Sequence, residues 1–218
     1  EMAELEARCL DHPADADKIV SLGRLYIQSE QNDRAQRLFS RLIELRPDRP
    51  EGYYGLAKLA FLNFKSTPVE RYNEAYRLCQ DALKRNPEFG LVYELLGTIF
   101  QNFPSSDHEG LSFKVEDPLD YFRRAVKLDP TCDIALWLLG DAYINQGELQ
   151  LAIEMLEQAA ALNTDASSVY FLLAVIYLGQ RQYEKQDWAQ RKAKQLSPNT
   201  QLSFDYEQKI LNLCGFEY

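Results

Sequence analysis

The stretch DIALWLLGDAYINQGELQLAIEMLEQAAALNT, residues 133–164, carries the pattern from which the rest of the chain is built. Apolar residues recur at helical spacing in two runs separated by Asn145, Gln146 and Gly147, which predicts two amphipathic helices joined by a turn. The two stripes consist of Ile134, Leu138, Leu139 and Ile144, and of Leu149, Ala152, Ile153, Leu156 and Ala159. Gly140 has no side chain to hold the two backbones apart, so we expect them to approach closely there. Helices this short cannot bury their apolar faces alone, and the stretch therefore predicts further copies on either side.

Prolines mark those copies along the chain. Each of five prolines follows a helical run and stops it, because the proline ring cannot continue a helix. These are Pro13, Pro47, Pro87, Pro130 and Pro198, in contexts such as IELRPD, LKRNPE, VKLDPT and KQLSPN. The interval from Pro13 to Pro47 is 34 residues, Pro130 to Pro198 is twice that, and Thr164 stands where the intervening proline would fall.

Between the prolines, leucine, aromatic and small residues recur in phase. The five copies hold Ile19, Leu22, Gly23, Tyr26, Ala35 and Phe39; Tyr53, Leu56, Ala57, Ala60, Ala75 and Cys79; Tyr93, Leu96, Gly97, Phe100 and Phe122; Leu136, Leu139, Gly140, Tyr143, Ala152 and Leu156; and Tyr170, Leu173, Ala174 and Tyr177. In the fifth copy, Gln186 and Gln190 stand where Ala and Phe are expected, so Trp188 and Ala189 are predicted to supply the packing instead.

This pattern resembles the tetratricopeptide repeat, W-x2-L-G-x2-Y, then A-x3-F, then P, over about 34 residues. The resemblance implies an all-α fold: a right-handed α-solenoid of antiparallel helix pairs with a C-terminal capping helix. It places the second helix of an incomplete repeat at residues 1–13 and five repeats within residues 14–198. The repeats are expected at 14–49, 50–89, 90–132, 133–166 and 167–198.

Two copies are longer than the period, and both carry the extra residues between their helices. In the second copy, Thr67-Pro68-Val69-Glu70 predicts a capping box with proline in the first turn of a lengthened second helix. In the third copy, the polar stretch 104–117 precedes a helix predicted to restart at Asp117-Pro118, and Leu111, Phe113 and Val115 alternate as in a short extended piece. This insertion is either a tolerated surface loop or a finger for a particular partner.

The end of the chain, residues 199–218, is expected to be a capping helix and tail. The apolar stripe of that helix is Leu202, Tyr206, Ile210 and Leu213. Leu211, Phe216 and Tyr218 exceed what a cap needs, and they either pack onto the last repeat or contact another copy of the chain, which would make a homo-oligomer.

Charge and cysteine content restrict the partners and the compartment. The formal net charge is -9, which disfavours nucleic acid and anionic membrane surfaces and favours partner segments with basic and apolar residues. No apolar run approaches the ~18 residues that a membrane helix needs. Cys9, Cys79, Cys132 and Cys214 form no CxxC pair, so we interpret them as reduced thiols of a cytoplasmic protein. The chain starts inside a helix, as a truncated or processed protein would, so a secreted or periplasmic location stays open.

No residue pattern for catalysis, a metal or a cofactor occurs in the sequence. His12 and His108 are the two histidines, and neither has neighbours that indicate a catalytic triad or a metal site. Phosphate-binding glycine loops and hydrolase elbows are absent as well. The sequence therefore predicts a protein that is not an enzyme.

The resemblance implies a concave face, lined by the first helix of each repeat, that holds an extended or helical peptide. Projecting the helical period predicts that the ligand-contacting residues of this face are Arg24, Tyr54, Lys58, Phe61, Glu94, Gln101, Trp137, Asp141 and Phe171, with Ile134, Ser168, Val175 and Leu178 beside them. Tyr54, Trp137 and Phe171 either face a ligand or are buried between neighbouring first helices, and burial is favoured for Val175 and Leu178. The Lys/Asn/Arg clamp with which some tetratricopeptide chaperone adaptors grip a C-terminal carboxylate does not occur at the matching positions.

Three functions fit these observations. The chain is an adaptor or scaffold that binds a peptide or amphipathic helix in its aromatic-lined groove, a structural or self-associating segment of a larger assembly, or a regulatory module of a larger enzyme. All three predict that this segment binds protein and is non-catalytic.

Overall fold

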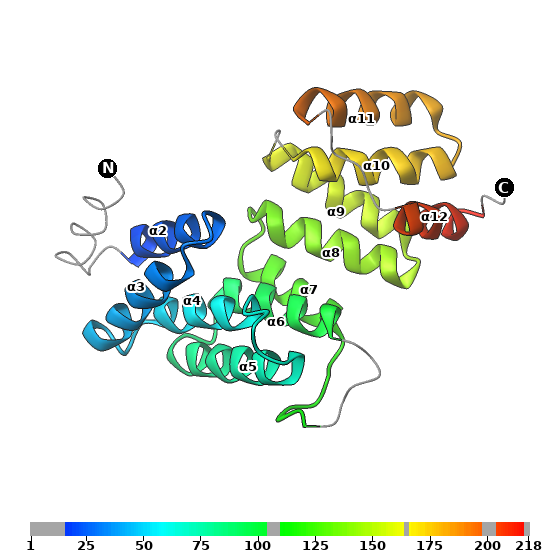
Figure 1. Cartoon of the computed structure of the whole chain (residues 1–218). Helices are drawn as coiled ribbons and strands as arrows, with labels where there is room; N and C mark the ends of the chain where they lie inside the picture. Colours follow the sequence, from blue (N-terminus) through cyan, green and yellow to red (C-terminus); the bar gives the residue numbers. More distant parts are fainter. Residues whose placement is uncertain (1–15, 104–109, 164–165, 198–203, 216–218) are drawn as a thin grey trace. The chain divides into compact units, whose positions relative to one another are not determined.

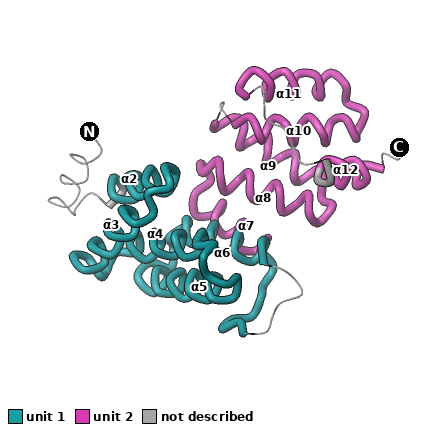
Figure 2. The backbone as a smooth tube through the Cα atoms, viewed as in Figure 1, with its two compact units in different colours: residues 1–118 teal, residues 119–218 magenta. Residues whose placement is uncertain are grey.

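Helices make up most of the described chain, which the computed structural model gives for residues 16–103, 110–163, 166–197 and 204–215. Eleven helices and no strand occur among these residues. The chain divides into two units, residues 1–118 and 119–218 (Figure 2), and each is described by itself. Residues 1–13, predicted as part of an incomplete repeat, lie outside the described residues.

Both units are built from short helices that pack on their sequence neighbours (Figure 1). The first unit contains α2 (Ala16–Gln28), α3 (Asn32–Leu45), α4 (Pro50–Phe61), α5 (Pro68–Arg85) and α6 (Gly90–Asn102). The second contains α7 (Pro118–Leu128), α8 (Asp133–Gln146), α9 (Leu149–Leu162), α10 (Ser167–Gly179), α11 (Tyr183–Leu196) and α12 (Phe204–Leu213). The helix pairs α2–α3, α4–α5, α8–α9 and α10–α11 each lie within one predicted repeat.

The recurring residues of the sequence pattern form the core of both units. Fully or nearly fully buried members include Leu22, Tyr26, Ala35 and Phe39, then Ala57, Ala75 and Cys79, and in the second unit Leu136, Leu139, Ala152, Leu156, Leu173 and Tyr177. Ile134 is an exception, because its side chain is 43% exposed. The stripe predicted for residues 133–146 was therefore wrong at this position: α8 buries Ala135, Leu136, Leu139 and Tyr143, and Ile134 lies outside that stripe.

The ring of Phe39 fills a gap between two first helices. A Cβ added to Gly23 of α2 or to Gly55 of α4 would overlap this ring. Phe39, which comes from α3, therefore joins its own first helix to the next one, and both contacts require the absence of a side chain. In the second unit, a Cβ at Gly140 would come within 2.9 Å of Leu156 Cγ, which confirms the close helix approach predicted there.

The carbonyl of the proline that ends one helix pair accepts a hydrogen bond from the first tyrosine of the next pair. Tyr53 Oη donates a hydrogen bond to the Pro47 carbonyl oxygen at 3.3 Å, and Tyr93 Oη does the same to the Pro87 oxygen at 2.8 Å. Arg85 also donates to the Pro47 oxygen at 3.2 Å. The repeated Pro and Tyr positions thus fix the turn between successive pairs, since the proline carbonyl has no helical donor.

The lengthened second helix of the second repeat begins as predicted. Thr67 is the N-cap of α5: its hydroxyl accepts from the Glu70 N–H, and the Glu70 carboxylate accepts from the Thr67 N–H at 3.0 Å. Pro68 occupies the first turn and α5 runs for 18 residues. The two hydrogen bonds from Thr67 lower the pKa of the Glu70 carboxyl.

The described part of the second insertion lies against α5 of the same unit. Asn73 of α5 donates to the Gly110 carbonyl oxygen at 2.8 Å and accepts from the Ser112 N–H at 2.8 Å. Phe113 stacks on Tyr76 with ring centroids 4.2 Å apart. Leu111, Phe113 and Val115 are half-buried and the residues between them are exposed, so the predicted alternation is present although no ladder forms among the described residues.

The predicted cap is present as α12, which packs against α10. A Cβ at Gly179, the last residue of α10, would overlap Cys214, and Lys209 donates to Asn145 Oδ1 at the end of α8 at 2.6 Å. The buried residues are Ile210 and Leu211, whereas Leu213 is 42% exposed, so Leu211 packs on the last repeat and the predicted stripe was wrong at Leu213. Leu202, Phe216 and Tyr218 lie outside the described residues.

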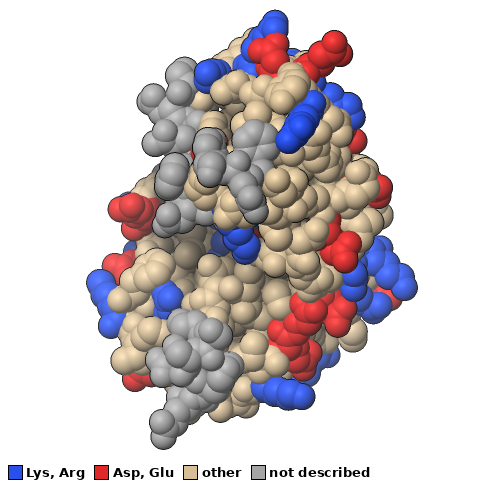
Figure 3. Space-filling model, turned by 90° about the vertical axis from the view of Figure 1, so that its right-hand side faces the viewer, with Lys and Arg blue, Asp and Glu red and all other residues tan. Residues whose placement is uncertain are grey.

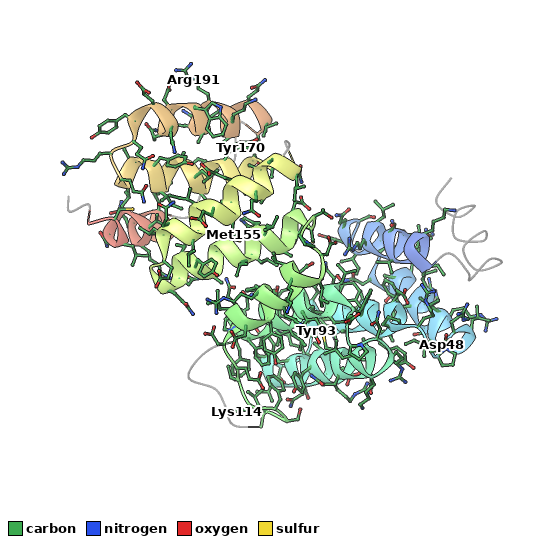
Figure 4. All side chains as sticks on the ribbon, turned by 180° about the vertical axis from the view of Figure 1, so that it is seen from behind. Asp48, Tyr93, Lys114, Met155, Tyr170 and Arg191 are labelled. Carbon is green, nitrogen blue, oxygen red and sulfur yellow. The ribbon has the colours of Figure 1, made fainter. Side chains whose placement is uncertain are left out.

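In the least regular pair, α11 buries only Ala189 and Ala193. Trp188 contacts Tyr170 edge-to-face at 5.6 Å yet stays 48% exposed, so it supplies only part of the packing predicted for it. Tyr170 lies between α10 and α11, while Arg191 points outward (Figure 4).

Gly23→Ala tests the Phe39 contact. Alanine favours a helix over glycine by about 1 kcal/mol, so a loss of stability has to come from the clash with the ring. We expect the free energy of unfolding, measured in urea, to fall by about 1–3 kcal/mol.

Leu25→Ala is the control for this variant, because Leu25 lies on the same helix and is 48% exposed. The second change Phe39→Leu should remove part of the penalty of Gly23→Ala. An unchanged or increased stability of Gly23→Ala would refute the packing account.

Asn73→Ala tests how the insertion is held. It removes the bonds to Gly110 and Ser112, so we expect trypsin to cleave after the exposed Lys114 several-fold faster while the melting temperature changes little. Asn102→Ala, which removes a side-chain bond to Thr98 within α6, is the control. Equal cleavage rates would show that Asn73 does not hold the segment.

Candidate functional site

In the first unit, the first helices of successive pairs lie side by side, α2 against α4 and α4 against α6. Four of the predicted site residues on these helices interact electrostatically: Arg24 of α2, Tyr54 and Lys58 of α4, and Glu94 of α6. Arg24 and Lys58 occupy corresponding places in the repeat, each directly after its Gly or Ala position. The predicted face therefore brings two cations and one carboxylate together.

Tyr54 belongs to the core of this cluster. Its side chain is 2% exposed and its ring contacts Phe89 edge-to-face at 5.8 Å. Burial raises the pKa of its hydroxyl to about 12, with Glu94 acting in the same direction, and Arg24 opposes both through its charge and a hydrogen bond. Of the two alternatives from the sequence, Tyr54 fits burial between first helices, because Phe89 covers its ring.

Lys58 lies beside Tyr54 and is half-buried. Burial lowers the pKa of its ammonium group; Glu94 opposes the shift and Arg24 adds to it. Among the described residues, no side-chain hydrogen bond or ion pair to the Lys58 ammonium group is present within 4.0 Å. A partly desolvated ammonium group that lacks a hydrogen-bonded counterion is unusual in a folded protein.

The other predicted residues of the first unit lie deeper or point elsewhere. Glu94 is 9% exposed, so its side chain is buried within the predicted face. Gln101 is half-buried, and its Oε1 atom is inaccessible to solvent. Phe61 packs against Tyr72 of α5 with ring centroids 5.8 Å apart, which directs it toward the partner helix of its own pair.

In the second unit, the predicted face contains a pocket of about 210 Å³. Trp137 and Ile134 of α8 line it, with Ser168 and Val169 of α10, Asp133, and Asn163 at the end of α9. Trp137 is half-buried, and its indole N–H is buried without an acceptor in the described part of the chain. Folding alone leaves this donor unsatisfied, so a hydrogen-bond acceptor on a ligand in the pocket could satisfy it.

Two further predicted residues of this unit are not among those that line the pocket beside Trp137. Asp141 is half-buried and accepts a long 3.5 Å hydrogen bond from Asn145. Phe171 packs against the hydrophobic core and is partly buried. Val175 is 3% exposed, which agrees with the burial favoured for it, and Leu178 is half-buried.

Asn163 is a pocket residue that the sequence did not predict. It donates to Asp133, the first residue of α8, at 2.5 Å and so joins the two helices that enclose the pocket. Its position just after a second helix, next to Thr164 where the proline is missing, is the signal that sequence reasoning could have used.

The surface charge and the residue types of the described chain give these observations. On the face shown in Figure 3, Lys and Arg side chains are mixed with Asp and Glu, and neither kind covers it. The described residues contain no group of three His, Cys, Asp or Glu suited to a metal ion. None of the described helices combines the length and apolar character needed to cross a membrane. His12 and His108 lie outside the described residues.

The tetratricopeptide repeat family model matches residues 20–88, 115–163 and 138–198. These segments cover more than half of the chain, so the protein belongs to the tetratricopeptide repeat family and has its all-α solenoid fold. Members of this family are typically non-enzymatic modules that interact with other proteins.

Particular relatives are similar at low identity. The mitochondrial import receptor subunit TOM70 of Homo sapiens is 24% identical over 177 residues, which cover 69% of this chain and 29% of that protein. The chain thus spans less than a third of the length of this relative. A thermophilic tetratricopeptide repeat protein of Thermus thermophilus has a TM-score of 0.61 at 22% identity, with 91% of this chain and 98% of that chain covered.

A third similar protein is YrrB, described as a TPR protein with an unusual peptide-binding site. Its TM-score is 0.52 at 20% identity, and the match covers 95% of this chain and 97% of that one. At these identities, the similarity to the solved structures supports the fold only.

Proposed function

We propose that this chain is a non-catalytic adaptor or scaffold module that binds a peptide segment of a partner protein along the first helices of its repeats. The pocket beside Trp137 carries this proposal. It lies on the predicted face, and an apolar side chain of a ligand would fit between Ile134, Trp137 and Val169.

The dimensions of the pocket suit an anchor rather than a whole ligand. A volume of about 210 Å³ is below the 300–1,000 Å³ typical of small-molecule sites. It is large enough for one aliphatic or aromatic side chain, and Asp133 and Ser168 on its wall offer polar contacts to the adjoining backbone. A linear segment with one buried anchor is the ligand that this geometry favours.

The alternatives have less support from the described residues. Self-association through the C-terminal tail would use apolar groups, yet Ile210 and Leu211 are already buried in their own chain. We also propose a cytoplasmic location, because the thiols of Cys79 and Cys214 are not in a disulfide.

Trp137→Ala provides the test, since the chain has two tryptophans and both lie in the second unit. A synthetic peptide array is screened with wild type and then with Trp137→Ala. We expect peptides that bind wild type to lose at least tenfold in affinity, about 1.4 kcal/mol. Trp188→Ala on α11, which truncates an exposed tryptophan outside the pocket, is the matched control and should bind like wild type.

Fluorescence separates a local contact from a distant effect. In Trp188→Phe, Trp137 is the sole tryptophan, and its emission should shift when a bound peptide fills the pocket. In Trp137→Phe, the remaining Trp188 should not respond. A response of Trp188 alone, or equal affinity of wild type and Trp137→Ala, would rule out this surface.

A further inference from the structure

The second copy of the repeat lacks an aromatic ring that the other four copies have. The last position of the W-x2-L-G-x2-Y pattern holds Ala60 in the second copy and an aromatic residue in each of the others. These aromatic residues are Tyr26, Phe100, Tyr143 and Tyr177, and each is at most 8% exposed. Since protein cores are closely packed, an alanine at this position leaves unfilled the space that a ring fills elsewhere.

Ala60 lines a hollow of about 610 Å³. Leu56 and Leu59 of α4 line it as well, with residues of α3 and α5, which both pack against α4 (Figure 1). Leu56, the leucine of the pattern, is half-buried, whereas the leucine at this position in each other copy is at most 3% exposed. The next residue, Phe61, packs against Tyr72 and is not among the residues that line the hollow. The missing ring therefore leaves core positions of the second copy partly open to solvent.

The chain has an aromatic ring beside the hollow, but this ring does not fill it. Phe64, in the loop between α4 and α5, lines the hollow and is 79% exposed, the largest value among the exposed large apolar side chains described. The guanidinium carbon of Arg71 lies 4.6 Å from the centre of the Phe64 ring and so holds the ring at this place. Phe64, Leu56 and Leu59 together offer apolar surface that the described chain leaves uncovered.

The charged groups of the hollow favour a basic ligand residue over an acidic one. Two carboxylates, Asp33 and Glu74, and one ammonium group, that of Lys65, line it. Glu74 is ion-paired with Arg77 at 2.6 Å, whereas Asp33 is exposed and has no ion pair within 4.0 Å among the described residues. Asp33 can therefore accept a charge-assisted hydrogen bond from a Lys or Arg side chain. The net charge of -9 attracts such a ligand at longer range.

We propose that this hollow is a second docking surface, which binds an aromatic side chain of a partner protein together with a neighbouring Lys or Arg. The aromatic ring packs against Leu56 and Leu59, in the space that Ala60 leaves, and the cation binds Asp33. The hollow is larger than the pocket of about 210 Å³ beside Trp137, so it accommodates part of a second residue as well as a ring.

This surface is separate from the first-helix face of the proposed function. None of the first-helix residues predicted to contact a peptide lines the hollow, which the second helices α3 and α5 border instead. A partner segment can therefore bind here whether or not the pocket beside Trp137 is occupied.

The experiment titrates the whole chain with fluorescein-labelled synthetic peptides that carry Phe, Tyr or Trp next to Lys or Arg. Each peptide has one counterpart with Ala in place of the aromatic residue and one with Glu in place of the basic residue. We expect affinity to fall at least tenfold for the Ala counterparts and several-fold for the Glu counterparts.

Ala60→Tyr gives the second copy the ring of the other copies. The new side chain should fill the hollow, so we expect at least a tenfold loss of peptide affinity while the melting temperature stays the same or rises. Ala161→Tyr, the same change at an exposed position of α9, is the matched control and should bind like wild type.

Two exposed residues provide the test if Ala60→Tyr does not fold. Phe64→Ala removes the ring beside the hollow, and Asp33→Lys reverses the charge at its rim, so each should weaken binding several-fold. Glu88→Lys, a charge reversal at an exposed carboxylate of the same unit outside the hollow, is the control for Asp33→Lys.

Four results would overturn the proposal. The first is equal affinity of wild type and the folded variants at Ala60, Phe64 and Asp33. The second is tighter binding by Phe64→Ala, which would show that Phe64 itself occupies the hollow. The third is binding of N-acetyltyrosinamide as tightly as the best peptide, which would indicate a small-molecule site. The fourth is self-association of wild type that Ala60→Tyr abolishes in sedimentation, which would identify a second copy of the chain as the occupant.

Trp137→Ala separates this surface from the proposed function. We expect it to leave the affinity for these peptides unchanged. If Trp137→Ala abolishes their binding and Ala60→Tyr does not, the proposed function stands and the second docking surface fails.

Discussion

The contact that the first unit depends on is the Phe39 ring between Gly23 and Gly55. One aromatic side chain from a second helix occupies the space that two missing side chains leave on successive first helices. The first repeat therefore contacts its neighbour as well as pairing its own two helices, as is typical of stacked repeats, in which each copy is stabilised by the next. In the second unit, the side chain of Leu156 lies in the same way against Gly140, within one helix pair.

This packing also decides which residues are left for binding. The second helices pack on the leucine, glycine and tyrosine positions of the first helices. The hydroxyls of Tyr53 and Tyr93, which stand at the first position of the pattern, donate to the proline carbonyls of the turns. The residues that directly follow the Gly or Ala position differ between repeats: Val175 is buried in the core, whereas Arg24 and Lys58 are half-buried. At the places of Arg24 and Lys58, a charged side chain is only partly removed from solvent.

Burial on the predicted face proved uneven. Tyr54 and Trp137 occupy equivalent positions of their repeats, yet Phe89 covers Tyr54, whereas Trp137 borders a pocket with Ile134. Helical periodicity gives the direction of a side chain from its own helix only. It carries no information about the residue that the next repeat places against it, and Phe89 lies outside the positions of the repeat pattern.

The sequence by itself determined the all-α repeat fold, the start of α5 at its capping box and most residues of the core, because these depend on local spacing and on contacts that recur with the period. Only the tertiary structure decided that Leu211 rather than Leu213 packs on the last repeat, that Asn163 lines the pocket, and that Lys58 is half-buried. Each of these depends on side chains from elements distant in the chain, whose packing no periodicity encodes.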